Sequence, residues 1–315
     1  MGSQWPVGPS SLHHIATSRL EEVESAITGL PLEVDRMSPG NAVAEFVALQ
    51  SPDLVVTAGE YGVPVHTRGG LPRDIVMLAL PLADGGGRWN GRGFQPELAW
   101  VYGPGSEHEG VGLTTSGFAA FALPSLVLDD LGMFGASQLD LDRRVLLVRD
   151  GDVVRLRQAA SELLDLMRRG LLRSEHAPAL TGDLLTQVVD LLAGGRPATR
   201  MRPSAARRIV DECLQVSDWI GPRPAPHELA ARTRVTDRRV RAAFNEIFGV
   251  PATTYFRLRA LHGAHRALRS ASPHDTSVTD VATRWGFWHL GRFSSEYRRY
   301  FGEPPSQTLR REDGR

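Results

Sequence analysis

The sequence contains no lysine and only one cysteine, although it has 315 residues and 36 basic side chains. We attribute the use of arginine alone to a GC-rich genome rather than to selection for guanidinium chemistry. The single cysteine, Cys213, excludes disulfides within the chain and a zinc site built from paired cysteines. Because Cys213 lies in a helical pattern, we expect a buried helix residue rather than a redox sensor.

Long apolar runs are also missing. No run is long enough to span a membrane. The first thirty residues lack the charged and then apolar layout of a signal peptide. The sequence therefore predicts a cytoplasmic protein with no membrane partner.

The motifs of common catalytic sites are absent as well. The sequence has no nucleophile elbow, phosphate-binding loop or dinucleotide glycine fingerprint. A metal site of the barrel type would need closely spaced histidine and acidic ligands, usually including His-x-His. The chain offers His66 and the run Glu107-His108-Glu109 instead, which we interpret as a turn histidine and a surface loop. We expect no catalytic residue, no metal and no cofactor.

Charge is unevenly distributed along the chain, although the formal net charge is zero. Residues 203–315 hold 19 Arg against 12 Asp or Glu, a balance of +7. Residues 1–202 hold 17 against 24, a balance of −7. The length suits two domains, each with its own core. A basic C-terminal domain beside an acidic N-terminal one indicates a surface for nucleic-acid phosphates.

The stretch TDVATRWGFWHLGRFSSEYRRYFGEPPSQTL, residues 279–309, has the layout of a helix-turn-helix. Ser277 and Asp280 form a weak capping box. The pattern predicts a short helix over 278–284, a turn at 285–287 and a longer helix to about Phe301. The expected apolar core is Val281, Ala282, Trp285, Phe287, Phe293, Tyr297 and Phe301. The expected outer face, where a recognition helix meets DNA, is His289, Leu290, Arg292, Ser295, Arg298 and Arg299.

A second copy of the pattern lies upstream, over residues 227–248. Thr236 is the expected N-cap of its second helix, and Gly249 ends that helix. Residues 252–269 form one continuous helical pattern between the copies, which suits two recognition helices in major grooves about 34 Å apart. The expected core is Leu229, Ala230, Val235, Val240, Phe244 and Phe248. The expected outer face is Arg238, Arg239, Arg241 and Ala242. Taken singly, either copy is equally consistent with an amphipathic helix pair that has a solvated basic face.

The last hundred or so residues resemble the DNA-binding domain of the AraC/XylS family of bacterial transcription regulators. The Gly-Phe, Phe-Ser, Tyr-Arg and Phe-Gly-x-x-Pro-Ser positions of the second motif all match. The first motif keeps Leu-Ala, Phe and Phe-Gly, and departs from the family at Arg234, where glycine is common. The resemblance implies promoter DNA and RNA polymerase as partners. It implies base contacts from Arg238, Arg241, Ala242, His289, Leu290, Arg292 and Ser295.

The N-terminal half follows a strand pattern. Residues 1–15 are rich in Ser, Pro, Gly and His and predict a loose tail. Over 16–150, short β-prone runs broken by Gly and Pro, with Asn90-Gly91 as a hairpin signal, predict a β-barrel or jelly roll. In the family, N-terminal sensing domains are often cupin-like. Aromatic residues that would line an effector pocket, or equally form ordinary core, are Trp89, Trp100, Tyr102, Phe118 and Phe121.

Residues 151–193 predict two amphipathic helices that either cover the barrel or pair with a second subunit as a homodimer. A polar linker over 194–203 leads into the DNA-binding domain, 204–311. The predicted fold class is thus α+β with two domains.

The function we expect is that of a DNA-binding transcription regulator that is not an enzyme, with a small-molecule effector and, by family habit, an activating role. The alternatives are a cupin-type metalloenzyme fused to a DNA-binding module and a ligand-free dimerisation cap.

Overall fold

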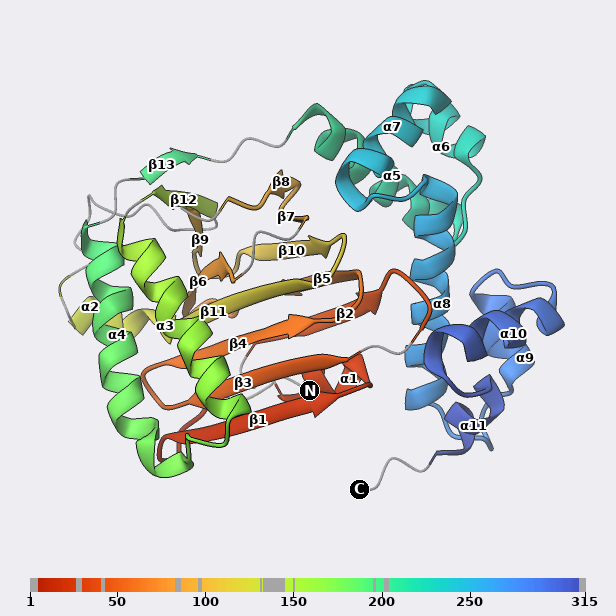
Figure 1. The fold of residues 1–315 in the computed structure, drawn as a ribbon. Helices are drawn as coiled ribbons and strands as arrows, with labels where there is room; N and C mark the ends of the chain where they lie inside the picture. The colour runs from red at the N-terminus through yellow and green to blue at the C-terminus, as the bar shows by residue number, and fades with distance from the viewer. Residues whose placement is uncertain are drawn as a thin grey trace. The chain divides into compact units, whose positions relative to one another are not determined.

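The computed structural model describes residues 5–26, 30–40, 43–82, 86–95, 98–130, 132, 145–149, 151–194, 197–200 and 204–311 (Figure 1). The chain forms two compact units. The N-terminal unit comprises residues 1–34 and 42–202, and the C-terminal unit comprises residues 35–41 and 203–315. One unit is rich in strands and the other is helical, which confirms the predicted fold class. Within the described residues, no helix has the length and apolarity to cross a membrane.

Two antiparallel sheets build the N-terminal unit. The first, sheet A, has eight strands in the order β1-β3-β4-β11-β6-β9-β12-β13, and the second, sheet B, has five in the order β2-β5-β10-β7-β8. Sheet A consists of β1 (Ser11–Thr17), β3 (Ala44–Gln50), β4 (Val55–Tyr61), β6 (Ile75–Pro81), β9 (Leu98–Tyr102), β11 (Ser116–Pro124), β12 (Val145–Arg149) and β13 (Pro197–Arg200). Sheet B consists of β2 (Leu32–Arg36), β5 (Val65–Gly70), β7 (Gly87–Trp89), β8 (Arg92–Gly93) and β10 (Glu107–Gly112).

Strand β1 extends into the segment for which the sequence predicts a loose tail. Residues 11–15 pair with β3, from Ser11 opposite Gln50 to Ile15 opposite Phe46. Leu12 is buried against sheet A, whereas most neighbouring side chains of this edge strand reach solvent. A single buried position gives too weak an alternation to outweigh the polar composition. In the segment predicted as a linker, residues 197–200 similarly form β13, paired with β12.

The predicted hairpin at Asn90-Gly91 is confirmed. It joins β7 to β8, with Trp89 opposite Arg92. Asn90 has φ 46° and Gly91 has φ 77°. A two-residue turn with both central φ angles positive matches the twist of the strands it connects, and Asn-Gly adopts it at low cost.

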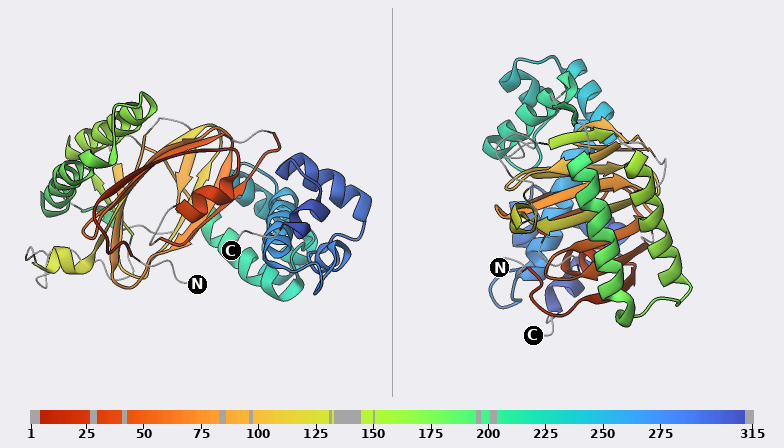
Figure 2. Two further views of the ribbon diagram at one scale, coloured as in Figure 1. Left: turned by 90° about the horizontal axis from the view of Figure 1, so that it is seen from below. Right: turned by 90° about the vertical axis from the view of Figure 1, so that its left-hand side faces the viewer.

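Two apolar layers fill the N-terminal unit. The first lies between the sheets and includes the buried residues Phe46, Tyr61 and Trp100. The second lies between the other face of sheet A and the helices α3 (Gly151–Arg168) and α4 (Ala177–Gly194), as Figure 2 shows. Both helices therefore bury their apolar stripes on the sheet, as expected for a cover. The remaining helical elements are α1 (Leu20–Ala26), α2 (Ser125–Asp130) and the 3-10 turn η1 (Ser174–His176).

The C-terminal unit contains seven described helices and the segment 35–41. The helices are α5 (Ala205–Ile220), α6 (Pro226–Thr233), α7 (Asp237–Phe248), α8 (Ala252–Ser270), α9 (Val278–Arg284), α10 (Leu290–Phe301) and α11 (Pro305–Arg310). Cys213 is buried in α5, and burial with the nearby Glu212 carboxylate raises the pKa of its thiol to about 11. The expectation of a buried helix cysteine is confirmed.

The segment 35–41 belongs to the C-terminal unit through buried polar contacts with α8. The Asp35 carboxylate accepts a hydrogen bond of 2.7 Å from Arg266. The His262 imidazole donates from Nε2 to the Arg36 carbonyl at 2.9 Å, and burial lowers the pKa of His262 to about 4. The Arg36 guanidinium in turn donates to the Tyr300 carbonyl. These contacts satisfy polar groups that would be costly to bury alone.

Helix boundaries in this unit follow the predicted caps. Thr236 precedes α7, and Gly249 ends it with φ 69°. The Ser277 hydroxyl accepts from the Asp280 amide at 3.1 Å, and the Asp280 carboxylate accepts from the Ser277 amide at 3.1 Å. The capping box that opens α9 is therefore complete.

Helix α6 ends on an unfavourable residue. Arg234 is its C-cap and adopts φ 54°, ψ 23°, in the left-handed region. Glycine occupies this conformation freely, whereas a residue with a Cβ is strained there by about 1–2 kcal/mol. The departure from the family pattern at this position is thus accommodated as backbone strain, without loss of the turn.

Arg234→Gly should raise the free energy of unfolding by about 0.5–1 kcal/mol, because relief of the left-handed strain exceeds the entropy that glycine adds to the unfolded chain. Urea unfolding of the full chain measures the change. Gly249→Ala, which places a Cβ at φ 69°, is the matched control and should lower stability. An unchanged or lowered stability for Arg234→Gly would contradict the assignment of strain.

Candidate nucleic-acid interface

The second helix-turn-helix consists of α9, a turn at residues 285–287, and α10. Gly286 has φ 77°, a conformation that the tight turn requires. Val281, Ala282, Phe287, Phe293 and Tyr297 are buried between the helices, whereas Trp285 and Phe301 are partly buried against the same cluster. The predicted helices, turn and core are confirmed for this motif.

Arg223 fixes the turn from outside the motif. Its guanidinium donates to the Gly286 carbonyl at 2.9 Å and lies 4.7 Å from the centre of the Phe287 ring. The cation and ring attract each other, and the hydrogen bond satisfies a carbonyl of the turn. The sequence gave no signal for this contact, because Arg223 is 63 residues from Gly286.

The first helix-turn-helix consists of α6 and α7. Leu229, Val240, Phe244 and Phe248 are fully or almost fully buried, as predicted. Ala230 and Val235 are half-buried. The first motif is therefore formed from the residues expected for it.

Helix α8 connects the two motifs and packs against both. On the side of the first motif, the Tyr255 ring stacks on Phe248 with centroids 4.1 Å apart. On the side of the second, the His265 ring stacks on Phe301 at 4.0 Å, and Arg257 forms an ion pair with Glu296 of α10. Nineteen residues in one helix span about 28 Å.

A buried chain of hydrogen bonds strengthens the second contact. The Tyr297 hydroxyl lies 2.6 Å from Nδ1 of His265 and donates to the Thr308 hydroxyl at 2.8 Å. Thr308 donates to the Glu303 carboxylate at 2.7 Å, and Glu303 pairs with Arg311 at 2.8 Å. A fully connected polar network of this kind favours one arrangement of α8, α10 and α11.

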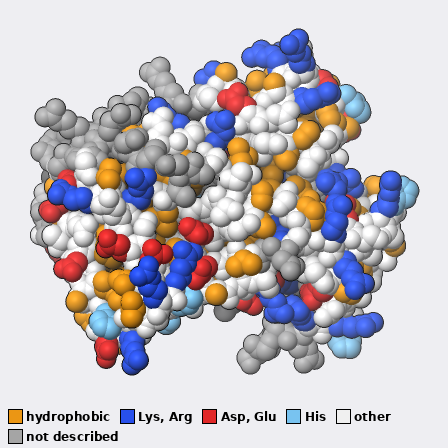
Figure 3. Space-filling view, in the orientation of Figure 1, with side chains coloured by type: hydrophobic (Ala, Val, Ile, Leu, Met, Phe, Trp, Pro, Cys, Tyr) orange, Lys and Arg blue, Asp and Glu red, His pale blue; other side chains and the backbone are white. Residues whose placement is uncertain are grey.

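The structure exposes every residue that the sequence assigns to DNA contact. Exposure alone leaves DNA contact untested, but it satisfies the first requirement of such a role. The residues are Arg238, Arg239, Arg241, Ala242, His289, Leu290, Arg292, Ser295, Arg298 and Arg299. Figure 3 shows Arg side chains gathered over the C-terminal unit on the face drawn there.

Three of these residues have local features that the sequence did not reveal. The Arg241 guanidinium pairs with Asp237, one turn earlier, at 2.7 Å. The Ser295 hydroxyl donates to the Gly291 carbonyl of its own helix at 2.9 Å. His289 is the N-cap of α10 and precedes its first turn. The ion pair holds the Arg241 side chain along the outer face of α7.

Sequence reasoning omitted one exposed residue of the second motif. Trp288 lies between the turn and the N-cap of α10, and 75% of its surface is accessible to solvent. Leu290, two residues later, is 38% exposed. A large apolar side chain immediately before a recognition helix was the available signal. Apolar groups there are suited to contact with a thymine methyl group.

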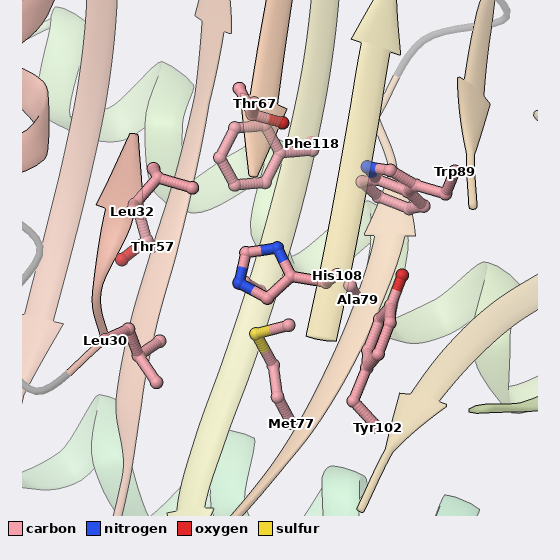
Figure 4. Close-up of a pocket in the computed structure, with 11 residues that line it drawn as sticks. Leu30, Leu32, Thr57, Thr67, Met77, Ala79, Trp89, Tyr102, His108 and Phe118 are labelled. Carbon is pink, nitrogen blue, oxygen red and sulfur yellow. The ribbon is translucent and has the colours of Figure 1, made fainter. Parts of the chain in front are cut away.

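A cavity in the N-terminal unit lies between the two sheets (Figure 4). It encloses about 530 Å³, part of which is open to solvent. Its lining comes from both sheets and from the residues that lead into β2. The lining residues are Leu30, Leu32, Thr57, Thr67, Met77, Ala79, Trp89, Tyr102, His108, Phe118 and Ala120.

The five aromatic residues predicted for a pocket fall into three groups. Trp89, Tyr102 and Phe118 line the cavity. Trp100 packs behind Trp89, with ring centroids 4.9 Å apart, and belongs to the core between the sheets. Phe121 is buried on the opposite face of β11, in the layer beneath α3 and α4. Since side chains alternate along a strand, Phe118 and Phe121 point to opposite faces.

His66 and Glu109 form a separate pair. His66 Nε2 lies 2.8 Å from Glu109 Oε1, and the two residues lie on neighbouring strands β5 and β10. Neither residue lines the cavity. In the part of the chain that the structure describes, no group of three or more His, Cys, Asp or Glu side chains is placed to hold a metal ion.

Comparison with known proteins matches the C-terminal region. Residues 229–311 match the family model described as a helix-turn-helix domain. The chain is 34% identical over 83 residues to a probable thc operon regulatory protein of Rhodococcus erythropolis, covering 26% of this chain and 25% of that protein. It is 38% identical over 82 residues to the XylDLEGF operon transcriptional activator of Pseudomonas putida, covering 26% of each.

A solved structure, that of a probable AraC family transcriptional regulator from Rhodopseudomonas palustris CGA009, is 32% identical to this chain. The match covers 32% of this chain and 94% of that one, with a TM-score of 0.29. The matched segment thus spans about a quarter of the length of the two curated relatives.

Two helix-turn-helix motifs joined by one helix, with exposed arginines on both recognition helices, define a DNA-binding protein of the double helix-turn-helix class. The matches assign its C-terminal region to a class of transcription regulators. The chain belongs to the AraC/XylS family, and the resemblance seen in its sequence is confirmed.

Proposed function

We propose that this protein regulates transcription by placing α7 and α10 in two successive major grooves on one face of promoter DNA. The observation that carries the proposal is the connection between the motifs. Helix α8 is continuous, and it is joined to each motif by aromatic stacking and to α10 by an ion pair. A rigid spacer of about 28 Å suits grooves that recur about every 34 Å.

Specificity in this arrangement comes mainly from α7. Arg238 and Arg241 carry guanidinium groups that can donate two hydrogen bonds to one guanine. The Asp237 carboxylate limits the rotamers of Arg241 and so lowers the entropy lost when that contact forms. On α10, His289 and Arg292 supply hydrogen bonds, and Trp288 and Leu290 supply apolar contact. Arg298 and Arg299 lie one to two turns further along α10 and contact phosphates in this proposal.

The N-terminal unit is the sensing part of the proposed regulator. Its cavity is separate from the layer of apolar residues that α3 and α4 cover. Binding of a small molecule there changes how the DNA-binding unit is presented to its site and thereby its contact with RNA polymerase, with activation as the expected outcome. The cytoplasm is the expected location, and a homodimer is the expected assembly.

Two other functions remain distinct from this proposal. A metalloenzyme of the cupin kind requires metal ligands that converge inside the barrel. The described residues that line the cavity contain one such side chain, His108. A ligand-free dimerisation cap requires an interior filled by side chains, and the cavity favours a sensor over that function.

Selection of random-sequence DNA by the full chain, at fixed salt, tests the two-groove proposal. The salt is fixed because the phosphate contribution to affinity depends strongly on it. We expect the enriched sequences to contain two short blocks about one helical turn apart. A single enriched block would restrict recognition to one helix. The absence of any enrichment would reject the proposed function.

Arg241→Ala should weaken binding to the selected site by roughly 1–3 kcal/mol and relax the preference at one base pair. The physical reason is the loss of two hydrogen bonds to one guanine. Titration of selected and random DNA with each variant measures the change. Arg232→Ala on α6 provides an arginine control from the same motif. Equal weakening on both DNAs would exclude base recognition by Arg241.

Arg292→Ala should cause the same selective loss at a base pair in the other block. This substitution tests whether α10 recognises bases itself or only supports α7. Arg310→Ala in α11 is the matched control, since Arg310 is exposed and lies outside both recognition helices. Unchanged binding by Arg292→Ala would reject the two-groove arrangement even if Arg241 recognises its guanine.

A further inference from the structure

We propose that the cavity between sheets A and B binds an uncharged, largely apolar small molecule that carries one hydrogen-bonding group such as a hydroxyl. The inference deepens the sensing role assigned to the N-terminal unit and rests on that proposed function. It names the chemical class of the effector, which the sequence left open.

The walls of the cavity are apolar and aromatic. Trp89, Tyr102 and Phe118 present rings to it from strands of both sheets. In Figure 4 the His108 imidazole lies between Phe118 and Met77, with Leu32 on one side and Tyr102 on the other. A pocket of this kind binds mainly by removing apolar surface from water, and its rings favour a flat ligand.

Polar groups in the cavity are few, and one of them has no partner. The Thr57 side chain is 1% exposed, and its hydroxyl makes no hydrogen bond to the protein. A buried hydroxyl without a partner costs free energy, which a ligand that hydrogen-bonds to it recovers. Tyr102, with its hydroxyl in a mostly apolar wall, lies beside His108 at a ring separation of 5.8 Å.

The lining has no fixed charge. None of the eleven lining residues that the structure describes is Asp, Glu or Arg. Burial lowers the pKa of His108 to about 4, so its imidazole is neutral near pH 7 and offers one donor and one acceptor. A carboxylate or an ammonium group would lose its hydration here without gaining a counterion. The cavity therefore selects against charged ligands.

Two glycines in sheet B keep the cavity open to these side chains. A Cβ added at Gly110 would lie 2.5 Å from the Thr67 hydroxyl and 2.7 Å from Trp89 Nε1. A Cβ added at Gly69 would lie 2.7 Å from His108 Nε2. Both glycines lie beneath side chains that line the cavity, so any larger residue would displace Thr67, Trp89 or His108. This local shape distinguishes a formed site from a packing defect.

Calorimetric titration of the full chain with 2-naphthol, 2-naphthoate and naphthalene tests the inference in the absence of DNA. The three probes share one ring system and differ in charge and hydrogen bonding. We expect 2-naphthol to bind at least about tenfold more tightly than 2-naphthoate, because only the carboxylate must be desolvated without a partner. We also expect it to bind more tightly than naphthalene. Equal or tighter binding of 2-naphthoate, or no binding of 2-naphthol, overturns the proposal.

Variants locate the binding in the cavity. Thr57→Val keeps the shape of the side chain and removes its hydroxyl, so it should reduce the preference for 2-naphthol over naphthalene. Thr114→Val makes the same change at an exposed position outside the cavity and should leave both affinities unchanged. Ala79→Leu and Ala120→Leu fill the cavity from neighbouring strands and should each weaken 2-naphthol binding, with folding checked by circular dichroism. Undiminished binding by two folded filling variants overturns the location.

DNA selection and probe titration fail independently. A chain that binds 2-naphthol but enriches no DNA sequence would retain the ligand class and lose the proposed regulation. A chain that enriches a two-block sequence but binds no probe would retain DNA recognition and lose this inference.

Discussion

Helix α8 is the constraint on which the C-terminal unit depends. Its side chains are buried along most of its length, and they supply the core of both helix-turn-helix motifs. One face stacks on Phe248 through Tyr255, and another stacks on Phe301 through His265. Because a helix resists bending, the two recognition helices keep a fixed separation. A change at either end of α8 therefore alters the geometry of both motifs together.

The helical unit was largely predictable from the sequence because its signals are local. Apolar spacing, the Ser277–Asp280 capping box and the glycines at 249, 286 and 302 determine helix limits within a few residues of the chain. The contact from Arg223 to the turn at Gly286 was not predictable, since it joins segments 63 residues apart. Nor did any pattern indicate that residues 35–41 complete this unit.

The N-terminal unit was predictable in class but less so in detail. The Asn90-Gly91 hairpin and most strands followed from turn residues and β-branched or aromatic runs. Selection of pocket residues by aromatic type alone was insufficient, because strand parity decides which face a ring occupies. Phe118 lines the cavity, whereas Phe121 lies on the other face of the same strand. Thr57 and His108 contribute polar atoms that no aromatic pattern could reveal.

The discontinuous composition of the C-terminal unit bears on how such proteins evolve by recombination. An exchange of DNA-binding domains that joins two parent genes near residue 203 would separate α8 from its own residues 35–41. His262 and Arg266 would then face a peptide from another lineage in place of Arg36 and Asp35. Functional chimaeras should consequently be confined to parents that preserve this short peptide, so the N-terminal segment and the DNA-binding helices are inherited as one piece.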